Sequence, residues 1–451
     1  MVAPAQSPNV NEKQSRRTRL RDVRRAVAFG LVFLTAFGVR LLCWRDVRFE
    51  AYKVQTAVTA NYKQMAHLLS ENGAASFFDP ASATSEPDLL GHPPGYPFVL
   101  VAVYSVFGES DAAAQLFQAA CDALTAALVF LIAAELLTFG VGVLAGLLAA
   151  FAPQFCWNSL MLLPDTLAVL PLLAAVYLFV RARAGRPLIK ALGAGVLVGL
   201  SCWLRANALL LAPFMALVAV PFLFSKGARV RSALVLVAGA LVAVAPLTLR
   251  NAVVYGHFIP LSLGAGQTLV EGIADYDPER RFGLPDTDIE LTRLEAEEAG
   301  QPEYAASLFT PDGIERDRRR TRRALAVISA NPLWFAGVMC RRAASMLRLE
   351  RTPLSSNAPV SEGLTRTLQK LFITAVFLPL YLAGLVLLLR ARRTRELAAL
   401  LTVPLYFFCV QSALHTEYRY VLAVHYLLFI VAATALQYAW LAARRVLFRS
   451  L

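Results

Sequence analysis

Long apolar segments alternate with short basic connections along most of the chain. Ten of them lie at about residues 26–44, 111–137, 139–156, 160–180, 190–205, 207–224, 231–249, 368–390, 397–414 and 420–442. A helix rises 1.5 Å per residue, so about 20 apolar residues cross roughly 30 Å of hydrocarbon. The pattern predicts an all-α polytopic membrane protein with about ten transmembrane helices, juxtamembrane helices and two large extracytoplasmic loops.

The segment at residues 96–108 decides the orientation of the chain. Its 13 residues span only about 20 Å as a helix, too little for an ordinary crossing. If this segment lies in the interface, the basic connections at 181–190, 226–231 and 390–395 fall on the same side as the N-terminus. Positively charged connections favour the cytoplasm. The charge pattern therefore predicts ten crossings, with both termini cytoplasmic.

This orientation divides the chain into three parts. A basic arm at residues 1–25 precedes the membrane domain at 26–442, and a short tail at 443–451 follows it. The first apolar stretch lacks a small-x-small cleavage pattern, which indicates an uncleaved span. The domain has outward loops at 45–110 and 250–366. The arginine-rich run at 316–323 is interpreted as a solvated helix face, and 325–349 as an interfacial segment.

The composition excludes a soluble chain, and it makes nucleic-acid binding a weak explanation of the positive charge. Hydrophobic residues make up 57% and charged residues only 17% of the sequence, against about a quarter charged in soluble proteins. The formal net charge of +13 is explained by topology, because basic residues gather in cytoplasmic connections. The six cysteines show no CxxC pair and no spacing typical of metal ligands.

Polar residues gather at the helix ends that face outward. They comprise Asp46 and Glu50 after the first span, Tyr62, the run from His92 through Tyr96 to Pro97, Asp165, Arg205, Arg250 with Asn251, and Glu417, Arg419 and Tyr420. Polar groups at membrane depth are costly and commonly functional. Arginines hold phosphates through planar, multidentate hydrogen bonds, and a carboxylate takes a proton from a hydroxyl nucleophile. Their convergence on one side favours a site for a lipid phosphate and an acceptor.

Several of these motifs, in this order, resemble the GT-C glycosyltransferases. They are His92-Pro93-Pro94-Gly95-Tyr96-Pro97, Leu204-Arg205-Ala206-Asn207, Arg250-Asn251 with Gly256-His257-Phe258, and Glu417-Tyr418-Arg419-Tyr420. The branch most similar contains protein O-mannosyltransferases (glycosyltransferase family 39) and bacterial aminoarabinose transferases. The resemblance implies an inverting transferase that takes a sugar from a polyprenyl-phosphate donor at the outer face of the cytoplasmic membrane. It also implies a juxtamembrane helix at 96–108.

The resemblance assigns roles to most of the polar cluster. It implies contact with the donor phosphate for Arg205, Arg250, Arg419 and His92, and places Tyr62, Tyr96, Asn251, Glu417 and Tyr420 around the same cavity. The chain departs from the family in one respect. An acidic residue, the catalytic base, usually precedes the loop tyrosine by three to five positions, where this chain has Ala57, Val58 and Thr59 before Tyr62. The base is therefore open between Asp46, Glu50, Asp165 and none of them.

Two other classes of protein remain as alternatives. One is a transporter or flippase for a lipid-linked sugar, which also needs outward arginines. Such proteins place charges near the membrane midplane, and here Asp122 and Glu135 are the clearest mid-helix charges. The other alternative is a catalytically inactive GT-C-like scaffold, which the missing loop acid favours.

The sequence names some binding partners only by class. They are a polyprenyl-phosphate-linked sugar, an unknown acceptor that is a protein, lipid or glycan, and membrane lipid, with no nucleic acid. No cofactor or divalent cation is required by this chemistry. The aspartates of the second loop, Asp275, Asp277, Asp286 and Asp288, are interpreted as a solvated acidic loop rather than a cation site.

Overall fold

The computed structural model describes residues 10–182, 185–350, 352 and 362–447. Parts of the predicted arm (1–9), of the second outward loop (351 and 353–361) and of the tail (448–451) lie outside the described residues, as does Arg183 in one of the basic connections. All regular secondary structure in the described ranges is helical.

Twelve helices form an elongated bundle. They are α1 (Val10–Tyr52), α4 (Asp111–Leu136), α5 (Phe139–Phe151), α6 (Pro153–Leu160), α7 (Asp165–Arg181), α8 (Pro187–Leu204), α9 (Leu211–Val218), α10 (Val220–Leu223), α11 (Arg229–Tyr255), α17 (Thr374–Arg390), α18 (Thr394–Cys409) and α19 (Leu422–Leu447). Six helices are long and apolar enough to cross a membrane, or up to eight if each of two bent pairs is one span. The prediction of a helical polytopic membrane protein is confirmed. Crossing by the shorter segments stays a prediction.

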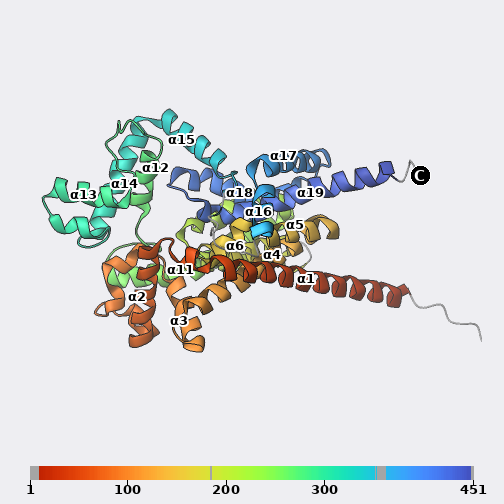
Figure 1. The fold of residues 1–451 in the computed structure, drawn as a ribbon, viewed down its shortest axis with the longest axis horizontal. Coiled ribbons are helices and arrows are strands. Elements are labelled where there is room, and N and C mark those ends of the chain that lie inside the picture. Colours follow the sequence, from red (N-terminus) through yellow and green to blue (C-terminus); the bar gives the residue numbers. More distant parts are fainter. Residues whose placement is uncertain (1–9, 183–184, 351, 353–361, 448–451) are drawn as a thin grey trace, which may run out of the picture.

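Six helices of the two predicted outward loops lie at one end of the bundle, and we call them the outward unit. They are α2 (Thr56–Asn72), α3 (Gly95–Phe107), α12 (Ala265–Ala274), α13 (Asp288–Ala299), α14 (Gly313–Ala330) and α15 (Pro332–Ser345). Helix α16 (Glu362–Leu371) instead lies beside α6 in the bundle. Figure 1 shows α12–α15 beside α2 and α3 at one end, while α1 begins and α19 ends at the other. A helix is thus confirmed where the sequence predicts one at 96–108. One boundary differs, because α1 continues to Tyr52 instead of ending near Trp44.

Small residues allow the bundle helices to pack closely. A Cβ added at Gly195 of α8 would lie 2.0 Å from the carbonyl oxygen of Leu236 in α11, and one at Gly239 would lie 2.5 Å from that of Leu192. Gly199 follows Gly195 by one turn and meets Ala240 and Ala243. Without a hydrophobic driving force between helices in lipid, such close contact is a main source of association. The α8–α11 pair therefore depends on glycine at these positions.

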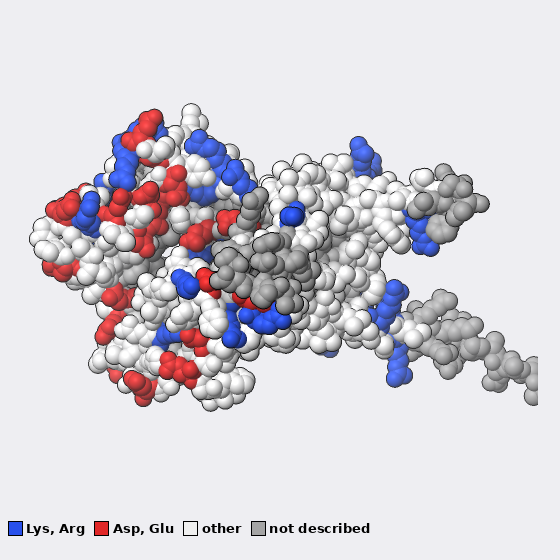
Figure 2. Space-filling view, viewed as in Figure 1, with Lys and Arg blue, Asp and Glu red and all other residues white. Residues whose placement is uncertain are grey.

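Charge divides the molecule along its length. On the face drawn in Figure 2, acidic and basic side chains mix over the outward unit, the middle of the bundle is nearly free of charge, and the far end carries only Lys and Arg. That far end holds Arg24 at the start of α1 and Arg444 and Arg445 at the end of α19. The distribution agrees with the positive-inside pattern of the sequence.

Two arginines of the run at 316–323 are buried, although the sequence predicts a solvated helix face. The run lies on α14, as a helix, but Arg316 and Arg320 are 0% and 2% exposed rather than solvated. Both pair with Glu295 of α13, at 2.7 Å and 2.6 Å. A carboxylate between two guanidiniums compensates their burial. The interpretation of the whole run as a solvated face is wrong for these two residues, because they are buried against α13, where Glu295 pairs with both.

A buried ion pair joins four helices inside the bundle. Arg40 of α1 and Asp122 of α4 are both completely buried, and the Arg40 Nε donates to Asp122 at 2.6 Å. Arg40 also donates to the carbonyl oxygens of Ala36, Ala149 and Ala150, and the hydroxyl of Tyr426 in α19 donates to Asp122. Removing one partner of such a pair leaves a charge without compensation.

We expect Asp122→Asn to destabilise the protein by about 3–5 kcal/mol, because the Arg40 charge would remain buried and unpaired. Thermal unfolding of the purified protein in detergent measures this. Glu135→Gln is a control on the same helix, because its pair with Arg25 is about one-fifth exposed, so water can reach the Arg25 charge that remains. Equal losses in the two variants would contradict the central role of the buried pair.

Candidate functional site

The outward ends of α7 and α8 bring the first two site residues together. Asp165 is the first residue of α7, and Arg205 caps the end of α8. Their side chains are 3% and 17% exposed, with the Arg205 Nε 3.3 Å from Asp165 Oδ1. An acidic side chain in the first turn of a helix interacts favourably with the helix dipole, so the start of α7 is a suitable position for Asp165. Neither of its oxygens has a hydrogen-bond partner among the described residues.

Residues at the start of the last span complete a cluster of arginines. The short helix η9 (Tyr418–Val421) carries Arg419, whose Nη2 donates to Glu417 at 2.8 Å and to the hydroxyl of Tyr420 at 3.2 Å. The Arg205 guanidinium stacks on the Tyr420 ring, 4.1 Å from its centroid. Tyr420 therefore separates the two guanidiniums and fixes their spacing.

A narrow cavity joins Asp165, Arg205 and Arg419. Its volume is about 20 Å³, and Ser201, Asn207, Tyr420 and apolar residues of α7, α18 and α19 complete the lining. Asn207 donates to the carbonyl oxygen of Tyr420 at 3.1 Å, and its own carbonyl oxygen accepts from Tyr406 at 2.7 Å. These bonds hold the turn after α8 against α18 and η9. Two guanidiniums and one carboxylate thus meet in a small, largely buried space.

Aromatic residues of the first outward loop lie close to this cluster. The Tyr62 ring packs against those of His92 and Tyr96, each with centroids 5.1 Å away. Burial, with the charges of Arg205 and Arg419 nearby, lowers the pKa of His92 to about 4. His92 is therefore neutral at pH 7, so it interacts with an anion through a hydrogen bond and not as a cation. The Tyr62 hydroxyl is buried and has no described partner.

A second cavity lies on the other side of Arg419. Its volume is about 290 Å³, and Gln154, Trp157, Asn158, Glu350, Thr416 and Glu417 supply most of its polar lining. The broken helix pair α5–α6, bent by 53°, presents Gln154, Trp157 and Asn158. Proximity of Glu417, added to burial, raises the pKa of Glu350. Amides, an indole and carboxylates form the kind of lining that hydrogen-bonds a polar, hydroxyl-rich ligand.

Helix α12 connects the outward unit to the cluster. His415, just before η9, bonds to Asp275 at 2.9 Å, and its backbone N–H donates to the carbonyl oxygen of Thr268. The bond to Asp275 raises the pKa of His415. Glu271 of the same helix is buried beside Asp288, and burial together with that neighbour raises its pKa to about 9. Asp288 in turn acts electrostatically on His92.

Two predicted site residues lie apart from the cluster. All five N–H groups of Arg250 donate within the protein, to the carbonyl oxygens of Phe77 and Thr84, the side chains of Ser85 and Asn251, and the Tyr255 hydroxyl. Asn251 donates to the carbonyl oxygens of Ile259 and Leu261. Arg250 thus has no donor left for a phosphate in this arrangement, and it ties α11 to the first outward loop.

The three carboxylates proposed as bases have different surroundings. Asp46 pairs with Arg45 at 2.9 Å and Glu50 pairs with Lys53 at 3.0 Å, both on α1 and outside the two cavities. Asp165 alone among them lines the cavity of the arginines. Among the described residues, no group of three or more His, Cys, Asp or Glu side chains is placed to hold a metal ion.

Sequence reasoning missed several residues of the larger cavity. Gln154 and Asn158 lie four positions apart in an uncharged stretch, the first inside the predicted span at 139–156 and the second just after it. The signal that identifies them is Pro153 beside the two amides, because proline breaks a helix and exposes polar side chains at the bend. Glu350 is near Glu417 only through the fold, and its sequence neighbourhood gives no such signal.

One protein-family model matches the chain. Residues 91–249 match the model described as dolichyl-phosphate-mannose-protein mannosyltransferase. This segment contains His92, Asp165 and Arg205. No curated protein sequence matches the chain.

Solved structures extend the likeness to nearly the whole chain. The oligosaccharyltransferase AglB from Archaeoglobus fulgidus, in complex with an inhibitory peptide and a dolichol phosphate, matches at a TM-score of 0.52 and 15% identity, covering 96% of this chain and 52% of that one. Its apo form matches at a TM-score of 0.54, 16% identity, and 94% and 52% coverage. ArnT from Cupriavidus metallidurans bound to undecaprenyl phosphate matches at 0.40 and 16%, covering 90% and 77%.

The comparisons confirm the resemblance to the GT-C glycosyltransferases. The family model covers about one-third of the chain, residues 91–249. The likeness to the oligosaccharyltransferase shows a shared fold, and this chain spans about half of the length of that protein. The findings therefore place the likeness to membrane glycosyltransferases in one part of the sequence and in the fold.

We expect the stability of the outward unit to fall as the pH rises from about 4.5 towards about 9. The raised pKa of Glu271 means that the folded state binds a proton which the unfolded state releases, so stability is lost on approaching the folded pKa. Glu271→Gln should flatten this dependence and stabilise α12 at pH 8, as measured by hydrogen exchange. Glu303→Gln, at an exposed position of the same unit, should leave the profile unchanged.

Proposed function

We propose that the chain is an integral-membrane glycosyltransferase that transfers a sugar from a polyprenyl-phosphate-linked donor to an acceptor hydroxyl, with inversion at the anomeric carbon. The observation that carries this proposal is the buried Asp165 carboxylate, without hydrogen-bond partners, in one cavity with Arg205 and Arg419. The match to a mannosyltransferase model over the segment containing Asp165 and Arg205 supports it.

In this proposal Arg205 and Arg419 bind the donor phosphate. Guanidiniums match the geometry of phosphate oxygens and stay charged at any physiological pH. Arg419 Nε is buried without a described partner, so it has a donor to offer. The cavity of about 20 Å³ is too small for a phosphate group, so the side chains around it must separate when the donor enters. A structure of the same fold, an archaeal oligosaccharyltransferase, contains dolichol phosphate.

Asp165 is the proposed general base. Its carboxylate lies 3.3 Å from the Arg205 Nε, and its two oxygens have no hydrogen-bond partner among the described residues. A phosphate that engages the arginines would draw Arg205 away from Asp165. The carboxylate oxygens would then be free to accept the proton of the acceptor hydroxyl.

The proposed reaction exchanges one bond at the anomeric carbon for another. The acceptor oxygen attacks that carbon, the bond to the phosphate oxygen breaks, and the acceptor proton passes to Asp165. The polyprenyl phosphate leaves with the bonding electron pair, and the arginines stabilise the charge that grows on it. The sugar occupies the cavity of about 290 Å³ beside Arg419, where Gln154, Asn158 and Glu417 hydrogen-bond its hydroxyls.

The alternative of a lipid-linked sugar transporter is less well supported. Mid-helix charges would be its signature, but Asp122 pairs with the buried Arg40 and Glu135 pairs with Arg25 at 2.8 Å. Both acids therefore have structural partners. An inactive scaffold of the same fold remains the other alternative, and it differs from the proposal in lacking turnover.

The proposed orientation places both termini in the cytoplasm and the cavities at the outer face of the cytoplasmic membrane. The basic end of the bundle, with Arg24 and Arg444, would face the cytoplasm. The outward unit and the cluster at its base would then meet acceptors outside the cell membrane. The acceptor is a protein, a lipid or a glycan.

We expect Asp165→Asn to lower turnover by about 10²–10⁴-fold, because a positioned general base contributes that much. The assay follows release of polyprenyl phosphate from polyprenyl-phosphate-linked sugars by the purified protein. Asp46→Asn and Glu50→Gln are matched controls that remove a carboxylate outside the cavities and should retain turnover. Loss in a control but not in Asp165→Asn would reassign the base, and no release by the unmodified protein with any donor would favour the scaffold or the transporter.

Replacement of Arg419 or Arg205 by Gln should weaken binding of undecaprenyl phosphate by about tenfold or more, since each change removes a charge-assisted hydrogen bond of about 1.5–3 kcal/mol. Native mass spectrometry or fluorescence titration measures the affinity. Lys63→Gln is the control, because Lys63 pairs with Asp111 on the first outward loop and lines neither cavity. Unchanged binding in both arginine variants would remove the phosphate assignment.

A further inference from the structure

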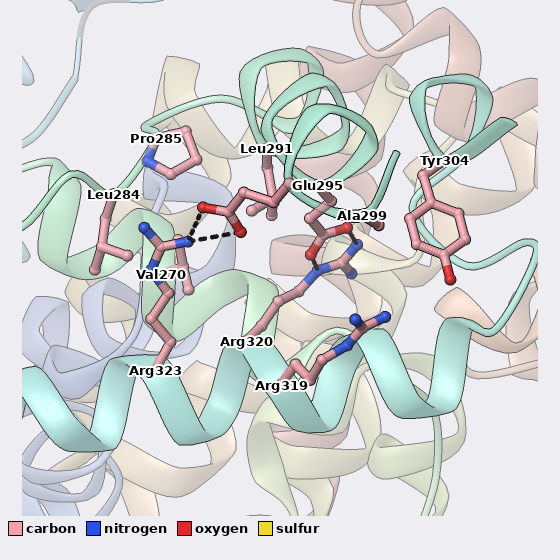
Figure 3. Close-up of a pocket in the computed structure, with 11 residues that line it drawn as sticks. Val270, Leu284, Pro285, Leu291, Glu295, Ala299, Tyr304, Arg319, Arg320 and Arg323 are labelled. Carbon is pink, nitrogen blue, oxygen red and sulfur yellow. Dashed lines mark hydrogen bonds and ion pairs between the residues drawn. The ribbon is translucent and has the colours of Figure 1, made fainter. Parts of the chain in front are cut away.

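A third cavity lies within the outward unit, between α13 and α14. Its volume is about 250 Å³, and it shares no lining residue with the two cavities at Arg419. Figure 3 shows Arg319, Arg320 and Arg323 extending from α14, with Arg320 directed at Glu295 of α13, Arg323 on the side of Leu284 and Arg319 on the side of Tyr304. The proposed transfer reaction uses none of these residues.

One wall of this cavity is apolar. Val270 of α12 and Leu291 of α13 are 1% and 3% exposed, and Leu284 with Pro285 completes the wall (Figure 3). Opposite stands a wall of guanidiniums and carboxylates. A ligand that fits both walls has one apolar face and one face rich in charge or hydrogen-bonding groups.

The charges around the cavity do not balance. Glu295 is shared by Arg316 and Arg320, and Glu298 pairs with Arg323 at 3.0 Å. Arg319 lines the cavity and has no ion pair or hydrogen bond among the described residues. Three guanidiniums and two carboxylates therefore line the cavity, which leaves an excess of one positive charge.

Arg320 provides a second observation that points to an anion. Its side chain is 2% exposed, its Nε and Nη2 bond to Glu295, and its Nη2 also donates to the carbonyl oxygen of Leu308. The Nη1 atom is buried and has no partner in the described part of the chain. A buried guanidinium donor without an acceptor is costly, and an anionic ligand would satisfy it.

We propose that this cavity binds a sugar unit that carries a carboxylate or a phosphate. Arg319 and the Nη1 of Arg320 hold the anionic group. The C–H face of the sugar ring packs on Leu284 and Leu291, while the sugar hydroxyls donate hydrogen bonds to the carboxylate of Glu298. The volume of about 250 Å³ suits a single sugar ring rather than a long chain. This binding does not depend on the proposed transferase activity.

The test is isothermal titration of the full-length protein in detergent with glucuronate, glucose 1-phosphate and glucose. We expect at least one of the two anionic sugars to bind about tenfold or more tightly than glucose, because a charge-assisted hydrogen bond is worth that much. Whether the carboxylate or the phosphate ligand binds identifies the group that is recognised. Arg319→Gln should weaken this binding by about tenfold.

Arg318→Gln is the matched control, because Arg318 is the exposed neighbour on α14 and does not line the cavity. Arg319 is itself exposed, and it has no ion pair or hydrogen bond to another described residue, so its replacement should leave thermal unfolding unchanged. The proposal is overturned if neither anionic sugar binds, if glucose binds as tightly as both, or if Arg318→Gln and Arg319→Gln weaken binding equally.

Discussion

The ion pair between Arg40 and Asp122 is the constraint on which the rest of the bundle depends. A charged pair without water access is stable only where hydrogen bonds satisfy the remaining donors and acceptors. Here, three backbone carbonyl oxygens and the hydroxyl of Tyr426 supply those bonds, so α1, α4, α5 and α19 must keep one mutual arrangement. Since α4 also packs against α7, and η9 leads directly into α19, this arrangement determines where Asp165 and Arg419 lie.

In both outward sites, carboxylates of the protein already pair with arginines that are proposed to bind an anionic ligand, or with their neighbours. In the cluster at the base of the outward unit, Asp165 pairs with Arg205, one of the arginines proposed to bind a phosphate. In the cavity between α13 and α14, Glu295 is shared between two arginines, while Arg319 has no partner among the described residues. An incoming anion would therefore share guanidinium donors with a carboxylate that is already present, or replace it. Burial makes each exchange worth more than it would be in water.

Particular residues show how far the sequence could be interpreted. The apolar segments and the helix at 95–107 follow from hydropathy and length, because in lipid each span must satisfy its own backbone hydrogen bonds. Asp165, Arg205 and Arg419 were predicted to lie on one side, and they line one cavity. Arg250 has the same sequence character, at the end of an apolar segment, yet three of its donors bond to the first outward loop and two to its own helix. Position along the chain cannot distinguish these two uses of arginine.

The sequence by itself determined the helical membrane fold, the charge asymmetry of its ends and the residue types available for phosphate binding and proton transfer. Those properties follow from local composition and spacing, which hydrocarbon thickness and the positive-inside rule translate directly into structure. Only the tertiary structure decided which arginines keep free donors, which carboxylate shares their cavity, and that Arg316 and Arg320 are buried on Glu295. Pairing between segments distant in the chain sets these outcomes, and a single sequence carries no local signal for it.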